Sequence, residues 1–151
     1  MIIYTLGTSN RSEEEFLEIL KFYQIKAIAD VRRWPTSQRF PHFKKENLIK
    51  ILSENNILYY HLEDLGGYRI ENYENYIKTF TFKDALEKLI EIAKKGLTCI
   101  ICAEKFPWRC HRRFITRALE EKGIEVLHII EKGKIWKPKT VLFSLTNFKK
   151  Q

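Results

Sequence analysis

The sequence predicts an α/β fold: a single domain with a mostly parallel five-stranded sheet and helices on both faces, in a Rossmann-like three-layer arrangement. Short apolar runs alternate with amphipathic helical patterns along the chain, which is typical of βαβ units. The 151 residues are 44% hydrophobic and 30% charged, a globular composition with enough length for a core. No apolar run of about 18 residues occurs, so no contact with a membrane is expected.

Elements in the first half of the chain follow from periodicity and capping. Ser12 and Glu15 form a capping box, the pattern that begins a helix, and apolar residues follow at helical spacing. A second helix is expected over 45–55, where leucine and isoleucine recur on one side. The expected strands span residues 2–6, 27–31 and 57–61. A polar and aromatic loop with two prolines separates the second strand from the second helix.

In the second half, two glycines mark helix ends: Gly96 closes one helix and Gly123 another. The helices expected here span residues 73–80, 82–95 and 110–122, and the strands span 97–102 and 125–129. Together these elements define a domain over residues 1–130.

Residues 131–151 differ in composition and are expected to form a basic C-terminal tail or an extra strand, for which 141–143 is a candidate. This tail holds six lysines and one glutamate, whereas residues 1–130 hold 21 basic and 18 acidic side chains. The net charge of +8 therefore comes mostly from the tail, and the domain is only mildly basic. The N-terminus lacks the features of a signal peptide, so a cytoplasmic location is expected.

Unusual side chains concentrate in the loops that follow strands. In open parallel sheets, ligands bind beyond the carboxyl ends of the strands. The loops at that edge are 7–11, 30–43, 61–72 and 102–110, and eight of the nine arginines lie in loops or helix starts. Arginine recognises planar and tetrahedral anions through its guanidinium fork, so this distribution predicts an anion site.

The helix expected to start at Cys110 has Arg109, Arg112 and Arg113 around its first turn. Cations at a helix N-terminus are unfavourable by about 0.3–1 kcal/mol each when exposed. A bound phosphate or carboxylate, held by free N–H groups and guanidinium forks, would account for them. The alternative is that these side chains point into solvent or pair with nearby acids.

The predicted ligand is an anionic small molecule or nucleic acid that bears phosphate, with a nucleotide or a nucleic acid favoured. Arg11, Arg32, Arg109 and Arg112 are expected to hold its charge, and Trp34 and Trp108 to contact its base. The full set of candidate binding residues is Thr8, Ser9, Asn10, Arg11, Arg32, Trp34, Gly66, Gly67, Trp108, Arg109, His111 and Arg112.

Three residues are candidates for catalysis. Asp30 or Glu104 could act as the base of a hydrolytic or group-transfer reaction, although either could equally orient an arginine. Cys110 lies beside Arg109 and His111 at a helix start, which lowers a thiol pKa and favours a nucleophile. A thiol-dependent transferase is therefore an alternative function. Whether the chain is an enzyme stays open.

No metal and no cofactor are expected. Cys99 and Cys102 have the spacing of a redox or zinc pair, but both fall in one predicted strand. Three strand steps separate their Cα atoms by roughly 10 Å, and the odd offset puts them on opposite faces. A disulfide needs about 4.4–6.8 Å, so neither a disulfide nor a zinc site is predicted.

Four motifs occur in order: Leu6-Gly7-Thr8-Ser9-Asn10-Arg11; Asp30-Val31-Arg32 with Pro35 and Pro41-His42-Phe43; Leu65-Gly66-Gly67; and Cys102-Ala103-Glu104 with Trp108-Arg109-Cys110-His111-Arg112. In this order and spacing, residues 1–130 resemble the family called domain of unknown function 488 (DUF488). The resemblance implies a single α/β domain and no settled activity. Thr8 stands where members often have His.

A further alternative is a noncatalytic nucleic-acid-binding module. The tail interleaves lysines with an aromatic side chain at Lys134, Trp136 and Lys137, a combination that can pair phosphates and stack bases. The opposing interpretation is a solvated appendage packed on the sheet edge.

Overall fold

A computed structural model describes residues 1–35, 37–66 and 72–137. Within these residues, six strands form one sheet in the order β3-β2-β4-β1-β5-β6. Their bounds are β1 Ile2–Gly7, β2 Ala27–Asp30, β3 Leu58–His61, β4 Thr98–Cys102, β5 Glu125–Glu131 and β6 Lys134–Trp136. The first five strands run parallel. Every residue of β2 and β4 is buried, as expected for apolar strands covered on both faces.

The α/β class is confirmed, but the sheet has six strands rather than five. The additional strand, β6, pairs antiparallel with β5, and the register shifts between Ile129 and Glu131. A segment of three residues at a sheet edge is too short to carry a periodic signal, which is why the sequence predicts either a tail or an extra strand here. The strand candidate at 141–143 lies outside the described residues.

The helices are α1 Glu13–Phe22, α2 Lys45–Glu54, α3 Tyr73–Tyr76, α4 Phe80–Lys95 and α5 Arg112–Glu120. The predicted capping box is present at α1, where the Glu15 N–H donates to Ser12 Oγ at 3.0 Å. Thr79 caps α4, so the helix predicted over 73–80 ends early and α4 begins two residues before its predicted start. Within the described ranges, no helix is both long and apolar enough to span a bilayer.

Helix α5 begins at Arg112, two residues later than predicted. Pro107 opens a short 3-10 turn, η3 (Pro107–Arg109), and Cys110 then adopts an extended backbone with φ −127° and ψ 155°. Cys110 therefore lies just before the helix, where its side chain is free to turn back toward the sheet.

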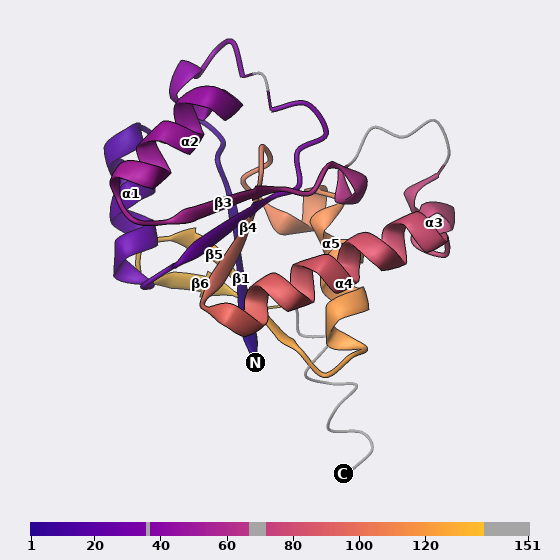
Figure 1. The fold of residues 1–151 in the computed structure, drawn as a ribbon. Helices are drawn as coiled ribbons and strands as arrows, with labels where there is room; N and C mark the ends of the chain where they lie inside the picture. The colour runs from indigo at the N-terminus through magenta and orange to yellow at the C-terminus, as the bar shows by residue number, and fades with distance from the viewer. Residues whose placement is uncertain (36, 67–71, 138–151) are drawn as a thin grey trace.

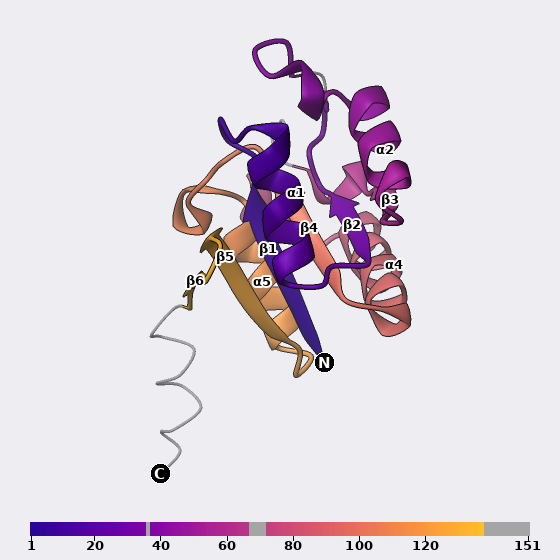
Figure 2. The same cartoon turned by 90° about the vertical axis from the view of Figure 1, so that its left-hand side faces the viewer.

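Helices cover both faces of the sheet (Figure 1). Turned by 90°, α1 lies in front of the strands and α5 lies behind them (Figure 2). One apolar cluster joins α1 and α2 to the sheet and includes Cys99. The other joins α4 and α5 to the opposite face and includes Cys102 and Cys110. Cys102 thus faces away from Cys99 and toward Cys110.

The chain changes direction between the neighbouring strands β1 and β4. From β1 it crosses to β2 on one side, and from β4 it crosses to β5 on the other. Where two such connections diverge, an open sheet forms a crevice at its carboxyl edge. The Thr8 N–H donates to Cys102 O at 2.7 Å and the Ser9 N–H to Ala103 O at 2.9 Å, so the two loops leave the sheet side by side.

Gly7, at the end of β1, is required by this close approach. A Cβ at Gly7 would lie 2.1 Å from the carbonyl oxygen of Glu104, which belongs to the backbone and cannot swing aside. Any larger residue must therefore push the loop after β4 away from the sheet.

We expect Gly7→Ala to lower the free energy of unfolding by about 1–3 kcal/mol, the usual cost of overpacking. Gly96→Ala is the matched control, since its Cβ would meet only the Lys26 side chain at 3.4 Å. The control should stay within about 0.5 kcal/mol of the parent. Urea denaturation of the three proteins measures both, and equal stability of the two variants would contradict this account.

Candidate thiol site

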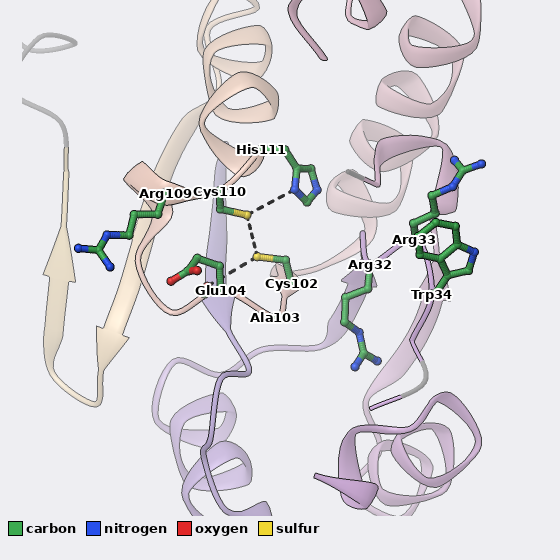
Figure 3. Close-up of a pocket in the computed structure, with 9 residues that line it drawn as sticks. All are labelled: Arg32, Arg33, Trp34, Cys102, Ala103, Glu104, Arg109, Cys110 and His111. Carbon is green, nitrogen blue, oxygen red and sulfur yellow. Dashed lines mark hydrogen bonds between the residues drawn. The ribbon is translucent and has the colours of Figure 1, made fainter. Parts of the chain in front are cut away.

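A cavity of about 370 Å³ lies at the carboxyl ends of β2 and β4. The loop after β2 supplies Arg32, Arg33 and Trp34 (Figure 3). The end of β4 and the segment that follows it supply Glu104, Arg109 and two thiols. The remaining lining residues are Cys102, Ala103, Cys110 and His111.

Cys102 and Cys110 form the chemical centre of this cavity. Their Sγ atoms are 3.0 Å apart, and Cys110 Sγ lies 3.4 Å from His111 Nδ1 (Figure 3). The Arg112 N–H, the first of α5, donates to Cys110 Sγ at 3.4 Å. The 3-10 turn after Pro107 reverses the chain and brings the second sulfur back over the end of β4.

These contacts shift the pKa values of the two thiols in opposite directions. The pKa of Cys110 is lowered, mainly by the hydrogen bond from the Cys102 thiol and then by the hydrogen bond and charge of His111 and the charge of Arg112. The pKa of Cys102 is raised by burial and by its interaction with Cys110. The opposite directions of the two pKa shifts favour a Cys110 thiolate beside a protonated Cys102, and the thiolate is the nucleophilic form.

Arg112 is fully buried, and its positive charge favours the ionised form of Cys110. Its Nη1 donates to Thr5 Oγ1 at 3.0 Å and its Nη2 to the Glu104 carbonyl at 2.6 Å. Thr5 also contacts His128 Nδ1 at 2.6 Å. Burial and the charge of Arg112 lower the pKa of His128 to about 3, so this histidine is neutral.

In the described part of the chain, Arg112 makes no ion pair with a carboxylate. A buried positive charge without a partner is costly. A Cys110 thiolate, two residues earlier in the sequence, supplies negative charge near the Arg112 guanidinium. The sequence predicts that Arg112 binds a ligand directly. In the structure, its Nη1 and Nη2 instead donate to Thr5 and to the Glu104 carbonyl.

Asp30 and Arg32 also bind one another rather than facing a ligand. Arg32 Nε and Nη2 donate to the two oxygens of Asp30 at 2.9 and 2.8 Å, and Nη1 donates to Phe43 O at 2.7 Å. Tyr59 adds a hydrogen bond to Asp30 at 2.6 Å. Asp30 is fully buried with both oxygens occupied, so these contacts favour the structural alternative over a catalytic base.

Arg11 lies outside the lining of the thiol cavity, whereas Arg109 is part of it. Arg11 is buried and donates to Gly7 O, Glu15 and Ile130 O, which fastens the loop after β1 to β5. Arg109 is exposed, lies over the Phe106 ring, and points away from Arg32 in Figure 3. Of the four arginines expected to share one anion, Arg32 and Arg109 line the thiol cavity, whereas Arg11 and Arg112 do not.

The other candidate residues are dispersed around the site. Thr8, Ser9 and Asn10 line a neighbouring cavity and not the thiol cavity. Trp34 lines the thiol cavity, whereas Trp108 stacks on Phe106 at a ring distance of 4.9 Å outside its lining.

Two loop segments complete this account. Gly66 packs against the backbone of Arg33, where a Cβ would come within 2.9 Å, and Gly67 lies outside the described residues. Glu104 lines the thiol cavity, and its Oε1 accepts a long hydrogen bond from the Phe106 N–H at 3.4 Å.

Sequence reasoning missed Cys102 as the partner of Cys110. The spacing of eight residues matches no familiar cysteine motif, and only the turn at Pro107 makes the sulfurs meet. The available signal was that Cys102 is the last residue of the predicted strand and Cys110 is the last residue of the loop that follows it. Across residues 1–35, 37–66 and 72–137, no three His, Cys, Asp or Glu side chains gather as a metal site would require.

Comparison with known proteins identifies one family. The family model described as "Domain of unknown function DUF488" matches residues 12–119. No curated protein matches the chain.

The lowered pKa of Cys110 predicts a distinctive pH profile of alkylation. An ordinary thiol with a pKa near 8.5 reacts about tenfold faster for each pH unit gained below that value. We expect alkylation of Cys110 by iodoacetamide to be nearly constant from pH 6 to 9, because the thiolate is already formed. Mass spectrometry of the labelled peptide measures the rate. Cys99, whose pKa burial raises to about 12, is the internal unreactive control.

Variants of Cys102 test the cause. Cys102→Ala removes the donor and should move the midpoint of the Cys110 profile to higher pH, whereas Cys102→Ser retains an O–H donor and should move it less. A Cys110 rate that rises through pH 8–9 in the parent protein would contradict the predicted ionisation.

Proposed function

The chain belongs to the domain of unknown function 488 family, which brings no activity with it, and we propose that it catalyses thiol-dependent group transfer with Cys110 as nucleophile. The observation that carries the proposal is the 3.0 Å distance between Cys102 Sγ and Cys110 Sγ. A disulfide bond is about 2.05 Å long, so closing it requires the sulfurs to approach by about 1 Å.

The reaction proposed is thiol–disulfide exchange in two steps. The Cys110 thiolate attacks one sulfur of a substrate R–S–S–R′, forming the Cys110–S–S–R mixed disulfide and releasing R′–S⁻. Cys102 then loses its proton and attacks Cys110 Sγ, forming the Cys102–Cys110 disulfide and releasing R–S⁻, which takes up the proton. The substrate gains two electrons and the protein dithiol loses them. Two molecules of an external low-molecular-weight thiol, which become a disulfide, restore the dithiol.

Charge around the cavity favours an anionic substrate, in keeping with the ligand class expected from the sequence. The lining includes Arg32, Arg33 and Arg109 but only one carboxylate, Glu104. Because Asp30 already neutralises Arg32, the cationic contribution comes mainly from Arg33 and Arg109. Trp34 adds an aromatic surface beside them.

A second candidate function, binding of single-stranded nucleic acid, is favoured by one observation. Trp108 is 45% exposed and lies between Phe106 and Trp136, with ring distances of 4.9 Å to each. Lys105 and Arg109 both lie over the Phe106 ring. Aromatic rings flanked by cations suit stacked bases and their phosphates.

The exchange reaction predicts a defined stoichiometry with 5,5′-dithiobis(2-nitrobenzoate), an anionic aromatic disulfide. We expect the reduced parent protein to release two thiolates per chain rapidly and to end as a Cys102–Cys110 disulfide without an adduct. Cys102→Ser should release one and keep a mixed disulfide on Cys110. Cys110→Ser should lose the rapid phase. Absorbance of the released thiolate and the protein mass measure these outcomes.

Cys99→Ser is the matched control for that experiment, since Cys99 faces the other side of the sheet, and it should behave as the parent does. A stable adduct on parent Cys110, with Cys102 still reduced, would rule out the second step.

The nucleic-acid alternative predicts that Trp108→Ala weakens binding of a labelled single-stranded oligonucleotide by about 1–3 kcal/mol. Fluorescence anisotropy at several salt concentrations measures it, and affinity should fall as salt rises. Phe22→Ala is the control, because Phe22 is also an exposed aromatic residue beneath a cation, Lys132, and does not line the thiol cavity. Binding that is unaffected by Trp108→Ala would remove this alternative.

A further inference from the structure

A second cavity, of about 510 Å³, opens at the same edge of the sheet. It lies between the loop after β1, which supplies Thr8, Ser9 and Asn10, and the loop after β2. It shares Arg32 and Ala103 with the thiol cavity. Those two residues border both cavities, which are therefore adjacent.

The chemistry of this second cavity differs from that of the thiol cavity. Hydroxyl and amide side chains line most of it, and its lining includes no acidic residue. Gln38 and Arg39 complete the polar lining from the loop after β2. Within the part of the chain that the structure describes, Arg39 makes no ion pair, and its guanidinium lies over the Phe40 ring 5.6 Å from the centroid.

The backbone of the loop after β1 is shaped for this position. Ser9 has a positive φ of 47°, a conformation that a residue with a Cβ adopts at some cost. The N–H groups of Thr8 and Ser9 are occupied by the Cys102 and Ala103 carbonyls, so the side chains rather than these amides face a ligand.

We infer that this polar cavity binds the phosphate group of a substrate whose reacting end reaches Cys110. Several hydroxyl and amide donors with the guanidinium of Arg39 suit a tetrahedral oxyanion, and open parallel sheets bind ligands beyond the carboxyl ends of their strands. The inference rests on the proposed thiol chemistry only for the position of the reacting atom. Arg39 thus takes the anion-binding role that the sequence analysis predicts for Arg11.

Isothermal titration with inorganic phosphate and with pyrophosphate tests the cavity directly. We expect Arg39→Gln to weaken binding about tenfold, which corresponds to about 1.4 kcal/mol. Gln38→Glu, which adds a negative charge to the lining at almost constant shape, should weaken it at least as much. Arg117→Gln is the matched control, because Arg117 is also exposed and lies over an aromatic ring, Phe114, at 5.7 Å.

Repeating the titrations in a Cys110→Ser background separates the two proposals. Phosphate or pyrophosphate binding that persists there and falls in Arg39→Gln supports the polar cavity even if thiol exchange has failed. Absence of binding to the parent protein overturns the inference while leaving the thiol exchange intact. Equal losses in Arg39→Gln and Arg117→Gln also overturn it, because they would reflect net charge alone.

Discussion

The guanidinium of Arg112 is a fully buried positive charge, and the candidate site is organised around it. Its guanidinium joins Thr5 in β1 to the carbonyls of Glu104 and Lys105 in the loop after β4. Its own backbone N–H, at the start of α5, donates to Cys110 Sγ. One residue thus connects a strand, a loop and a helix, and it favours the ionised form of the thiol that the same helix start positions.

Much of the fold could be predicted because its determinants are local. The capping residue Ser12, the glycine at the end of α4 and the apolar runs that became β1, β2 and β4 each act within a few residues. The start of α5 was placed two residues early because Cys110 and His111 do not conflict with a helix; the η3 turn set by Pro107 moves the boundary. β6 was uncertain because its pairing with β5 depends on backbone hydrogen bonds to a distant segment, and pattern does not encode these.

The site was harder to predict because a loop arginine has two ways to satisfy its five donors. The sequence does not distinguish a guanidinium that binds a ligand from one that binds carbonyl groups of its own loops. Arg11, Arg32 and Arg112 all do the second. Tight loops at the carboxyl edge of a parallel sheet leave carbonyl oxygens without ladder partners, and buried carbonyls must be satisfied. The pairing of Cys102 with Cys110 was hidden for the opposite reason: it requires a chain reversal that no spacing rule describes.

The burial of Arg112 and Cys110 also determines which external conditions can act on the thiol. Mobile ions screen charges that solvent reaches, over a Debye length of about 8 Å at physiological ionic strength, and they act much less on charges enclosed by protein. Lys105, Arg109 and the lysines of the β5–β6 edge belong to the first group. The field that ionises Cys110 belongs to the second, since it arises from a guanidinium with no exposed surface. The acidity of this thiol is therefore a property of the folded chain, largely independent of the salt around it, while the attraction of anions to the cavity mouth varies with the medium.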